Sequence, residues 1–246
     1  MYKITKLKFN SNFISKEDEI EEIEWLLTMY YRNGQVLENY LIEDHIDFYI
    51  VTVTIVDDDS LDEKYNNKYV TNQLNNLKYV SLSNIEIISD DAVASDSCHC
   101  TEYDRFYLIP SNDISSPIYC SKCEKEVPLY KLKHFYDDEY TPILDFVKTY
   151  QSLNKLWIFG LKDNYTRKEI GNPKSTFNKL GLNICNNYSK ILKKDVLLGI
   201  NSLIDVENEC QEEVTKCLKC GQELLLNKQS KLYSKECPKC KIIYEE

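Results

Sequence analysis

The chain has 246 residues, of which 43% are hydrophobic and 28% charged, and this balance is typical of a folded protein rather than a disordered one. No run approaches the roughly 18 apolar residues of a membrane span, and the first residues lack the apolar core of a signal peptide, so the sequence predicts a cytoplasmic protein with no membrane contact. Ten cysteines in a reducing compartment favour metal binding over disulfides.

The formal net charge of −10 is unevenly distributed along the chain. Residues 1–113 carry 9 Lys and Arg against 22 Asp and Glu, whereas residues 114–246 carry 21 against 18. Residues 148–200 are the most basic part, with 10 basic and 3 acidic side chains. This contrast predicts two modules with different surfaces, although solvated faces of an ordinary protein would give the same counts.

Residues 1–95 predict an acidic α/β sandwich of about ferredoxin-like size. Strands are expected over 2–10, 45–56 and 85–89 because these runs are apolar and rich in β-branched residues. Ser15 opens a helix with a capping box, and Gly34 ends it in the left-handed conformation. The acidic run at 57–59 is interpreted as the start of a second helix that extends to about 77; a divalent-cation site is the alternative.

Residues 96–135 predict a first zinc ribbon. The spacing Cys-x-Cys is tighter than an ordinary hook, whereas the Cys-x-x-Cys that follows twenty residues later is regular. A strand over 103–110 is expected to pair with one over 126–133. His99 can replace one thiolate ligand, and a redox pair or free thiols is the alternative to a metal site. The expected ligands are Cys98, Cys100, Cys120 and Cys123.

Residues 136–210 predict a mainly helical, basic segment. Thr141 and Pro142 form a helix start, a second helix is expected over 182–192, and a strand over 196–200. Cys185 falls on the helical pattern as a core residue, and no role is assigned to Cys210. The basic side chains here either track a phosphate backbone or solubilise the helices. They are Lys162, Arg167, Lys168, Lys174, Lys179, Lys190, Lys193 and Lys194.

Residues 211–246 predict a second zinc ribbon with two regular Cys-x-x-Cys hooks. Four thiolates fill a tetrahedral zinc ion and leave no open position for catalysis, so this site is structural. Gly221 suits the turn after the first hook, and strands are expected over 223–227 and 231–236. The ligands are Cys217, Cys220, Cys237 and Cys240, and the residues assigned to nucleic-acid contact are Lys219, Lys231, Tyr233 and Lys239. Two zinc ions are therefore expected in an α+β chain.

The order of these motifs resembles a bacterial family of zinc-ribbon-containing proteins described as nucleic-acid-binding (domain of unknown function 2310). The motifs that carry the resemblance are Cys98-x-Cys100, Ser116-Pro-Ile-x-Cys120-x-x-Cys123 leading into Val127-Pro-Leu-Tyr130, Lys155-Leu-Trp157, an Asn178-x-x-Gly181 turn and the two terminal hooks. The resemblance implies zinc ribbons and a nucleic-acid partner; it covers most of the chain and is best from about residue 98 onward.

Two functions are consistent with these features. The first is a non-catalytic zinc protein that binds nucleic acid through its basic C-terminal half. The second is a protein-binding adaptor or an immunity protein, whose acidic N-terminal half blocks a basic toxin. An enzyme is not expected, because the sequence shows no nucleophile–base pair, phosphate loop or glycine-rich fingerprint.

Overall fold

The computed structural model describes residues 2–90, 97–112, 116–201, 215–227, 230 and 233–245. It is a mixed α+β chain, as the sequence predicts. The chain divides into two compact units, whereas the sequence suggests four segments. The N-terminal unit comprises Met1–Ser97, Ile114–Ser116 and Glu126–Thr141, and the C-terminal unit comprises Cys98–Asp113, Pro117–Lys125 and Pro142–Glu246.

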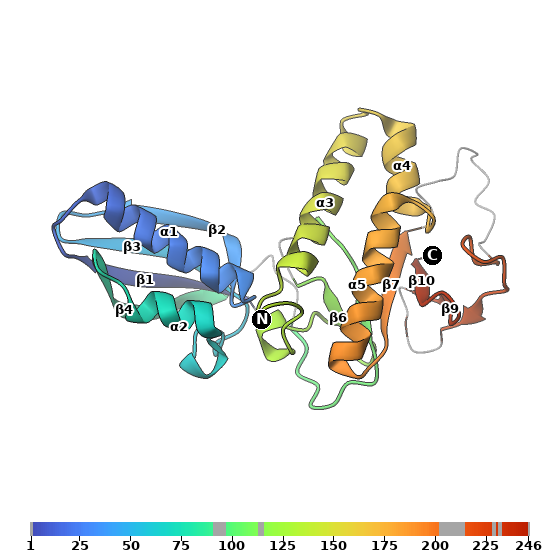
Figure 1. Cartoon of the computed structure of the whole chain (residues 1–246), viewed down its shortest axis with the longest axis horizontal. Helices are drawn as coiled ribbons and strands as arrows, with labels where there is room; N and C mark the ends of the chain where they lie inside the picture. The colour runs from blue at the N-terminus through green and yellow to red at the C-terminus, as the bar shows by residue number, and fades with distance from the viewer. Residues whose placement is uncertain are drawn as a thin grey trace. The chain divides into compact units, whose positions relative to one another are not determined.

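The N-terminal unit is built on a four-stranded antiparallel sheet in the order β2-β3-β1-β4. Figure 1 shows α1 and α2 together on one face of this sheet. The chain order βαββαβ with this strand order is the ferredoxin-like, split βαβ topology. The elements are β1 (Lys3–Ser11), α1 (Lys16–Arg32), β2 (Val36–Asp44), β3 (Phe48–Ile55), the 3₁₀ turn η1 (Glu63–Tyr65), α2 (Lys68–Asn75) and β4 (Val80–Asp90).

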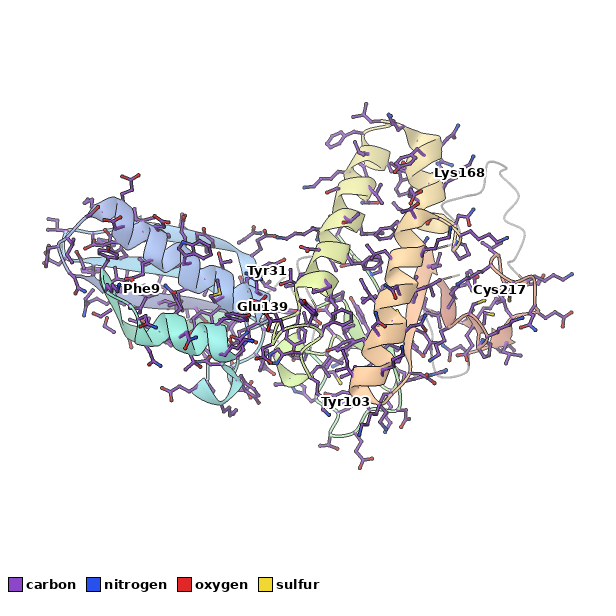
Figure 2. The ribbon with its side chains drawn as sticks, in the orientation of Figure 1. Phe9, Tyr31, Tyr103, Glu139, Lys168 and Cys217 are labelled. Carbon is purple, nitrogen blue, oxygen red and sulfur yellow. The ribbon has the colours of Figure 1, made fainter. Side chains whose placement is uncertain are left out.

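The core of this unit follows the strand alternation. Leu7, Phe9 and Val51 are fully buried against Ile23 of α1, and Figure 2 labels Phe9 at this position. The predicted helix start at Ser15 is confirmed, because its side chain accepts a hydrogen bond from the amide of Asp18. Strand β2 is an edge strand and is mostly exposed, so it lacks the alternating apolar pattern by which strands are recognised.

Several acidic side chains of this unit have structural partners. On α1, Glu22 accepts hydrogen bonds from three consecutive amides that lead into β4, and Glu19 accepts from the hydroxyl of Tyr49 at 2.7 Å. The Asp57–Asp59 run does not start a helix, which corrects the sequence interpretation. Helix α2 begins later and is capped by Asn67, while Asp57 forms an ion pair with Lys131 at 2.9 Å.

Residues 126–141 belong to the N-terminal unit and do not form the predicted strand over 126–133. They contain the 3₁₀ turn η2 (Leu129–Lys131) instead. Gly34 allows this approach, because a Cβ built there would lie 2.6 Å from the Cβ of Leu129 and its φ is +69°. The carboxylate of Glu139, which Figure 2 labels, forms an ion pair with Arg32 at the end of α1. The segment is therefore an integral part of this unit.

The C-terminal unit has one six-stranded sheet in the order β6-β5-β7-β10-β9-β8. Strand β7 lies in the middle, parallel to both β5 and β10. The strands beside the two cysteine clusters thus belong to one sheet. The elements are β5 (Phe106–Leu108), β6 (Ile118–Cys120), α3 (Thr141–Ile158), α4 (Asp163–Gly171), α5 (Thr176–Leu192), β7 (Val196–Asn201), β8 (Leu225–Leu226), β9 (Lys235–Cys237) and β10 (Ile242–Glu245).

Helix α5 packs on β7, and Figure 1 shows the two running side by side. A Cβ built at Gly181 would lie 2.7 Å from Cζ of Phe146 and 3.0 Å from Cδ1 of Leu198, so this glycine sits in a helix interface and not in the predicted turn. The side-chain amide of Asn178 donates to three backbone carbonyls around the end of α4 and holds the two helices together. No helix in the described part of the chain is long and apolar enough to cross a membrane.

Candidate metal centres

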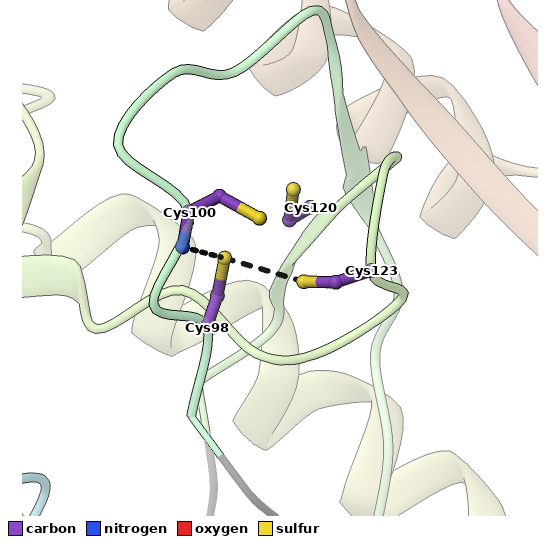
Figure 3. Close-up of side chains that lie close together, drawn as sticks. All are labelled: Cys98, Cys100, Cys120 and Cys123. Carbon is purple, nitrogen blue, oxygen red and sulfur yellow. Dashed lines mark hydrogen bonds between the residues drawn. The ribbon is translucent and has the colours of Figure 1, made fainter.

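The first cluster brings together the four cysteines predicted for the first site. Cys98 and Cys100 precede β5, Cys120 ends β6, and Cys123 lies in the turn after it. Figure 3 shows the four side chains converging, and their sulfur atoms all lie within 4.8 Å of one another. The Sγ atoms of Cys98 and Cys123 are 3.3 Å apart, far beyond a disulfide bond length of about 2.05 Å.

The second cluster has the same composition and spread. The sulfur atoms of Cys217, Cys220, Cys237 and Cys240 lie within 4.8 Å of one another, and those of Cys220 and Cys237 are 3.7 Å apart. A tetrahedral ion with metal–sulfur bonds of about 2.3 Å places its ligands about 3.8 Å apart. The donor set therefore fits a metal ion, and each of the two clusters can hold one.

The three regular Cys-x-x-Cys hooks share one backbone conformation. The residue after each second cysteine is left-handed: Glu124 has φ +56°, Gly221 +73° and Lys241 +54°. The amides of Glu124 and Gly221 donate to the carbonyls of Cys120 and Cys217, respectively, which closes these two turns. The conformation predicted for Gly221 is confirmed, and the same turn recurs where the sequence has no glycine.

Hydrogen bonds and burial set the electrostatics of the second cluster. Burial raises the pKa of Cys217, but hydrogen bonds from the hydroxyl of Tyr244 and from nearby amides lower it to about 6. Burial raises the pKa of Cys240 well above its ordinary range. An ion would need all four sulfur atoms as thiolates, so its binding would release protons from the groups whose pKa burial raises.

Among the described residues, Cys185 and His99 lie outside both clusters. His99 is exposed and is not among the grouped ligands, although it stands between two of them in the sequence. Cys185 lies on α5 and is 1% exposed, so the prediction of a core thiol is confirmed. Cys210 is outside the described residues.

The residues predicted to contact nucleic acid have different surroundings. Lys219 and Lys239 are exposed on the turns of the second cluster. Tyr233 is only 8% exposed and packs against Tyr107 and Ile243, so its ring is not available on the surface for base stacking. Lys231 lies outside the described residues.

A polar groove of about 700 Å³ lies beside the second cluster at the C-terminal end of α5. In the sequence these lysines look like scattered charges, because Lys241 is far from the other three. The pairing of β7 with β10 brings Lys241 beside them. Exposed asparagines on successive turns of α5 complete the lining, and helical spacing alone could have indicated this stripe. The lining residues are Asn183, Asn186, Asn187, Ser189, Lys190, Lys193, Lys194, Asp195 and Lys241.

Two family models match separate parts of the chain. Residues 102–196 match a family described as domain of unknown function (DUF2310). The predicted resemblance is confirmed there. Residues 1–88 match a second family, also described as a domain of unknown function (DUF8589), and this match covers the strands and helices of the N-terminal unit up to β4. No curated protein and no solved structure matches the chain.

Proposed function

We propose that the protein is a non-catalytic nucleic-acid-binding protein whose C-terminal unit is held together by two zinc ions. The observation that carries the proposal is the groove at the end of α5, where Lys190, Lys193, Lys194 and Lys241 gather on one polar surface. Lysines supply the charge that holds phosphates, and the neighbouring asparagine amides are donors and acceptors suited to sugars or base edges.

The charge of the groove is locally positive although the whole chain is acidic. Asp195 is the one acidic residue among the described lining residues, and its carboxylate is 2.7 Å from the Nζ atom of Lys241. This pair is neutral, so the exposed ammonium groups of the other three lysines set the local field. At long range the net charge of −10 opposes polyanions, and binding is therefore expected to be short-ranged and sensitive to salt.

Zinc is the metal that these donors favour. Four thiolates at tetrahedral spacing suit zinc or an iron site, and closed four-cysteine sites between strand hooks are the usual structural zinc arrangement. In this role the ions fix the ends of the sheet and the turn that carries Lys241 beside Cys240. The clusters thereby hold part of the groove in place without taking part in a reaction.

The binding proposal is tested by fluorescence anisotropy with single-stranded RNA, single-stranded DNA and duplex DNA over a series of salt concentrations. Replacing Lys190, Lys193 and Lys194 by glutamine should weaken binding and reduce the salt slope by about 2 to 3, because each phosphate contact contributes about 0.7 to 0.9. The matched control replaces three exposed lysines outside the groove, Lys162, Lys168 and Lys174. Equal effects of the two triple variants, or no binding at low salt, would exclude the groove.

Metal analysis tests the zinc proposal separately. The purified protein should contain two zinc ions per chain, and Cys120→Ser or Cys237→Ser should each reduce the content to about one. Iron in place of zinc would contradict the assignment of the metal. Full zinc content in either variant would show that the corresponding cluster is not the site.

A protein partner is a second candidate function, and one surface of α1 favours it. A shallow groove of about 640 Å³ runs along Glu17, Glu21 and Glu24, with Trp25 51% exposed beside them. An exposed aromatic ring among carboxylates suits the lysine or arginine side chains of a basic protein, the class to which a neutralised toxin would belong.

This second candidate is tested with a synthetic lysine-rich helical peptide and isothermal titration calorimetry. Trp25→Ala, and the pair Glu21→Gln with Glu24→Gln, should each weaken binding several-fold. The control pair Glu43→Gln with Glu86→Gln changes the net charge equally at exposed strand positions away from the groove. If the control pair weakens binding as much, the attraction is a property of net charge rather than of this surface.

A further inference from the structure

The turn between α3 and α4 carries a group of large apolar side chains that are exposed to solvent. Phe159 is 75% exposed, Ile158 65% and Leu161 56%. Tyr165, in the first turn of α4, is exposed as well. Single exposed apolar residues are normal on a protein surface, whereas a contiguous group marks an interaction site. We call these four residues the α3–α4 tip; neither the metal centres nor the proposed nucleic-acid groove uses them.

The backbone of this turn is fixed by hydrogen bonds. The amide of Leu161 donates to the carbonyl of Leu156 at 2.8 Å. The amide of Gly160, whose φ is +65°, donates to the carbonyl of Trp157 at 2.9 Å. These two bonds form a Schellman cap at the end of α3, and Lys162, also left-handed, then starts α4. The tip is therefore a defined helical turn that holds its apolar side chains at the surface.

The end of α3 extends beyond the part of the helix that packs in the core. Helix α3 buries Ile143, Phe146 and Val147 in its first half, and Asn154 is the only buried residue of this fully described helix after them. Figure 1 shows the tip at the top of the α3–α4 hairpin, whereas α5 runs down to the other end of the helical layer, where the lysine groove lies. The tip is thus a surface separate from the groove.

The charge around the tip is positive. Residues 155–168 contain four basic side chains and one acidic side chain, Asp163. The carboxylate of Asp163 is 2.9 Å from Nε of Arg167, so this pair is neutral. The three remaining basic residues are exposed and form no ion pair with any other described residue. They are Lys155, Lys162 and Lys168, and they flank the apolar side chains on both sides in the sequence.

We propose that the α3–α4 tip binds the surface of a membrane that contains anionic lipids. Apolar side chains such as Phe159 are stabilised at the boundary between head groups and acyl chains, and a tyrosine ring suits the same depth. Lysine side chains lay their methylene stems along apolar surface and extend the ammonium group to lipid phosphates and carboxylates. A lipid surface accepts such a tip without a shaped pocket, and the positive charge selects anionic lipids.

This proposal departs from the sequence-based expectation of no membrane contact. That expectation rests on the lack of a spanning segment, and the described helices indeed contain none. An interfacial contact needs only a few apolar side chains and nearby basic groups, so the length of the apolar run does not test it. Binding through so small a surface is expected to be reversible and to weaken with salt.

The test uses the intact, zinc-loaded protein and sedimentation with large unilamellar vesicles. Vesicles with about 30% phosphatidylserine in phosphatidylcholine are compared with vesicles of phosphatidylcholine alone. We expect binding to the anionic vesicles to be at least about tenfold tighter, because each lysine near an anionic surface contributes roughly fivefold. No binding to the anionic vesicles, or equal binding to both kinds, would overturn the proposal.

An apolar variant locates the contact. Phe159→Ser should weaken binding to the anionic vesicles about tenfold, because it removes the most exposed apolar side chain of the tip. Phe13→Ser is the matched control, since Phe13 is 70% exposed in the N-terminal unit. Equal losses in the two variants would contradict the assignment to the tip.

A charge variant tests the role of the lysines. Replacing Lys155, Lys162 and Lys168 by glutamine should abolish the preference for anionic vesicles. The control replaces Lys190, Lys193 and Lys194 of the nucleic-acid groove by glutamine, which changes the net charge equally. A control that loses the preference to the same extent would show that the groove, and not the tip, meets the lipid.

Trp157 reports the contact directly, because it precedes Ile158 at the end of α3. In a Trp25→Phe background its emission should shift to shorter wavelength when anionic vesicles are added, and Phe159→Ser should abolish the shift. Self-association of the free protein that Phe159→Ser abolishes, without vesicle binding, would assign the tip to a second copy of the chain and overturn the membrane proposal.

Discussion

The residues that follow the three regular Cys-x-x-Cys hooks all adopt the same backbone conformation. All three are left-handed, yet only Gly221 adopts this conformation without steric cost. Glu124 and Lys241 carry a side chain in the same region, which costs on the order of 1 kcal/mol each. The sequence predicts the turn at Gly221, and at the other two positions only the hook itself signals it.

Replacing Gly221 by alanine should weaken metal binding at the second cluster. A Cβ at this position meets open space, so the cost arises from the backbone alone and is about 1 kcal/mol. That energy corresponds to roughly a fivefold loss in affinity, measured by competition with a chelator. Gly221→Asn should lose less, because asparagine tolerates the left-handed region. Equal affinities of all three proteins would show that the turn relaxes.

His134 is a second residue whose role only the structure reveals. Its Nε2 atom is 2.9 Å from Oδ1 of Asn33, and the amide nitrogen of Asn33 already donates to Gln35 and to the carbonyl of Tyr65. Asn33 therefore accepts, and His134 must carry its proton on Nε2. Burial lowers the pKa of His134 below 6.5, although Asp138 and Glu139 act in the opposite direction.

This lowered pKa predicts a pH dependence for the N-terminal unit. Below about pH 6.5 His134 binds a proton more readily in the unfolded chain than in the folded chain. The contribution of the neutral His134 to the stability of the fold is therefore complete above that pH and is lost as the pH falls. His134→Gln keeps a donor for Asn33 but does not titrate. Its free energy of unfolding should change less than that of the wild type between about pH 7.5 and about pH 5.5.

Urea unfolding monitored by Trp25 fluorescence in a Trp157→Phe background provides the measurement, since Trp25 is in the N-terminal unit. The control is His45→Gln, which changes an exposed histidine of the same unit. If the His134 variant and the wild type lose stability in parallel as the pH falls, the buried histidine is not the titrating group.

At the scale of elements, the sequence predicts those with a periodic apolar face and misses those without one. Helix α1 and the central strands β1 and β3 follow clear periodicities, and each is found where it is expected. Strand β2 is missed because an edge strand exposes most of its side chains. The strand predicted over 126–133 is η2 instead, because its apolar residues pack on the N-terminal unit and not on the hairpin.

The contact between α5 and its neighbours gives a prediction at this scale. Gly181→Ala should destabilise the C-terminal unit by about 1 to 2 kcal/mol, although alanine favours a helix by about 1 kcal/mol. The added methyl group would overlap Phe146, whose ring is stacked on Phe177 with centroids 4.5 Å apart and cannot easily move. Calorimetric melting should show the loss, whereas Lys179→Ala, at an exposed position on α5, should change the unfolding free energy by less than about 0.5 kcal/mol. A Gly181→Ala protein as stable as the wild type would mean that the interface has free space.

At the scale of the whole molecule, the grouping of eight cysteines into two clusters follows from their spacing, but the division of the chain into two units does not. Spacing is a local property, and it identifies each hook without regard to the rest of the fold. The shared sheet depends on β7, which places β5 on one side and β10 on the other. Such parallel pairing joins residues far apart in the sequence, so no local pattern indicates it.

The shared sheet predicts that the two metal centres are energetically coupled. Cys237 is the last residue of β9, and Cys120 is the last residue of β6. A continuous series of paired strands, β9-β10-β7-β5-β6, connects these two cysteines. Cys237→Ser should therefore do more than empty the second cluster. The frayed sheet should also lower the zinc affinity of the first cluster, by roughly fivefold to tenfold in a chelator titration.

Thermodynamic linkage distinguishes this coupling between the two clusters from a general loss of stability. If zinc binding at one cluster raises the affinity at the other, the factor must be the same in both directions. Cys120→Ser should thus lower the affinity of the second cluster by the factor that Cys237→Ser imposes on the first. Cys185→Ala removes a buried thiol from α5 outside both clusters and should leave the ratio of the two affinities unchanged. Two clusters that release zinc independently in all these variants would behave as separate ribbons, as the spacing of the cysteines alone suggests.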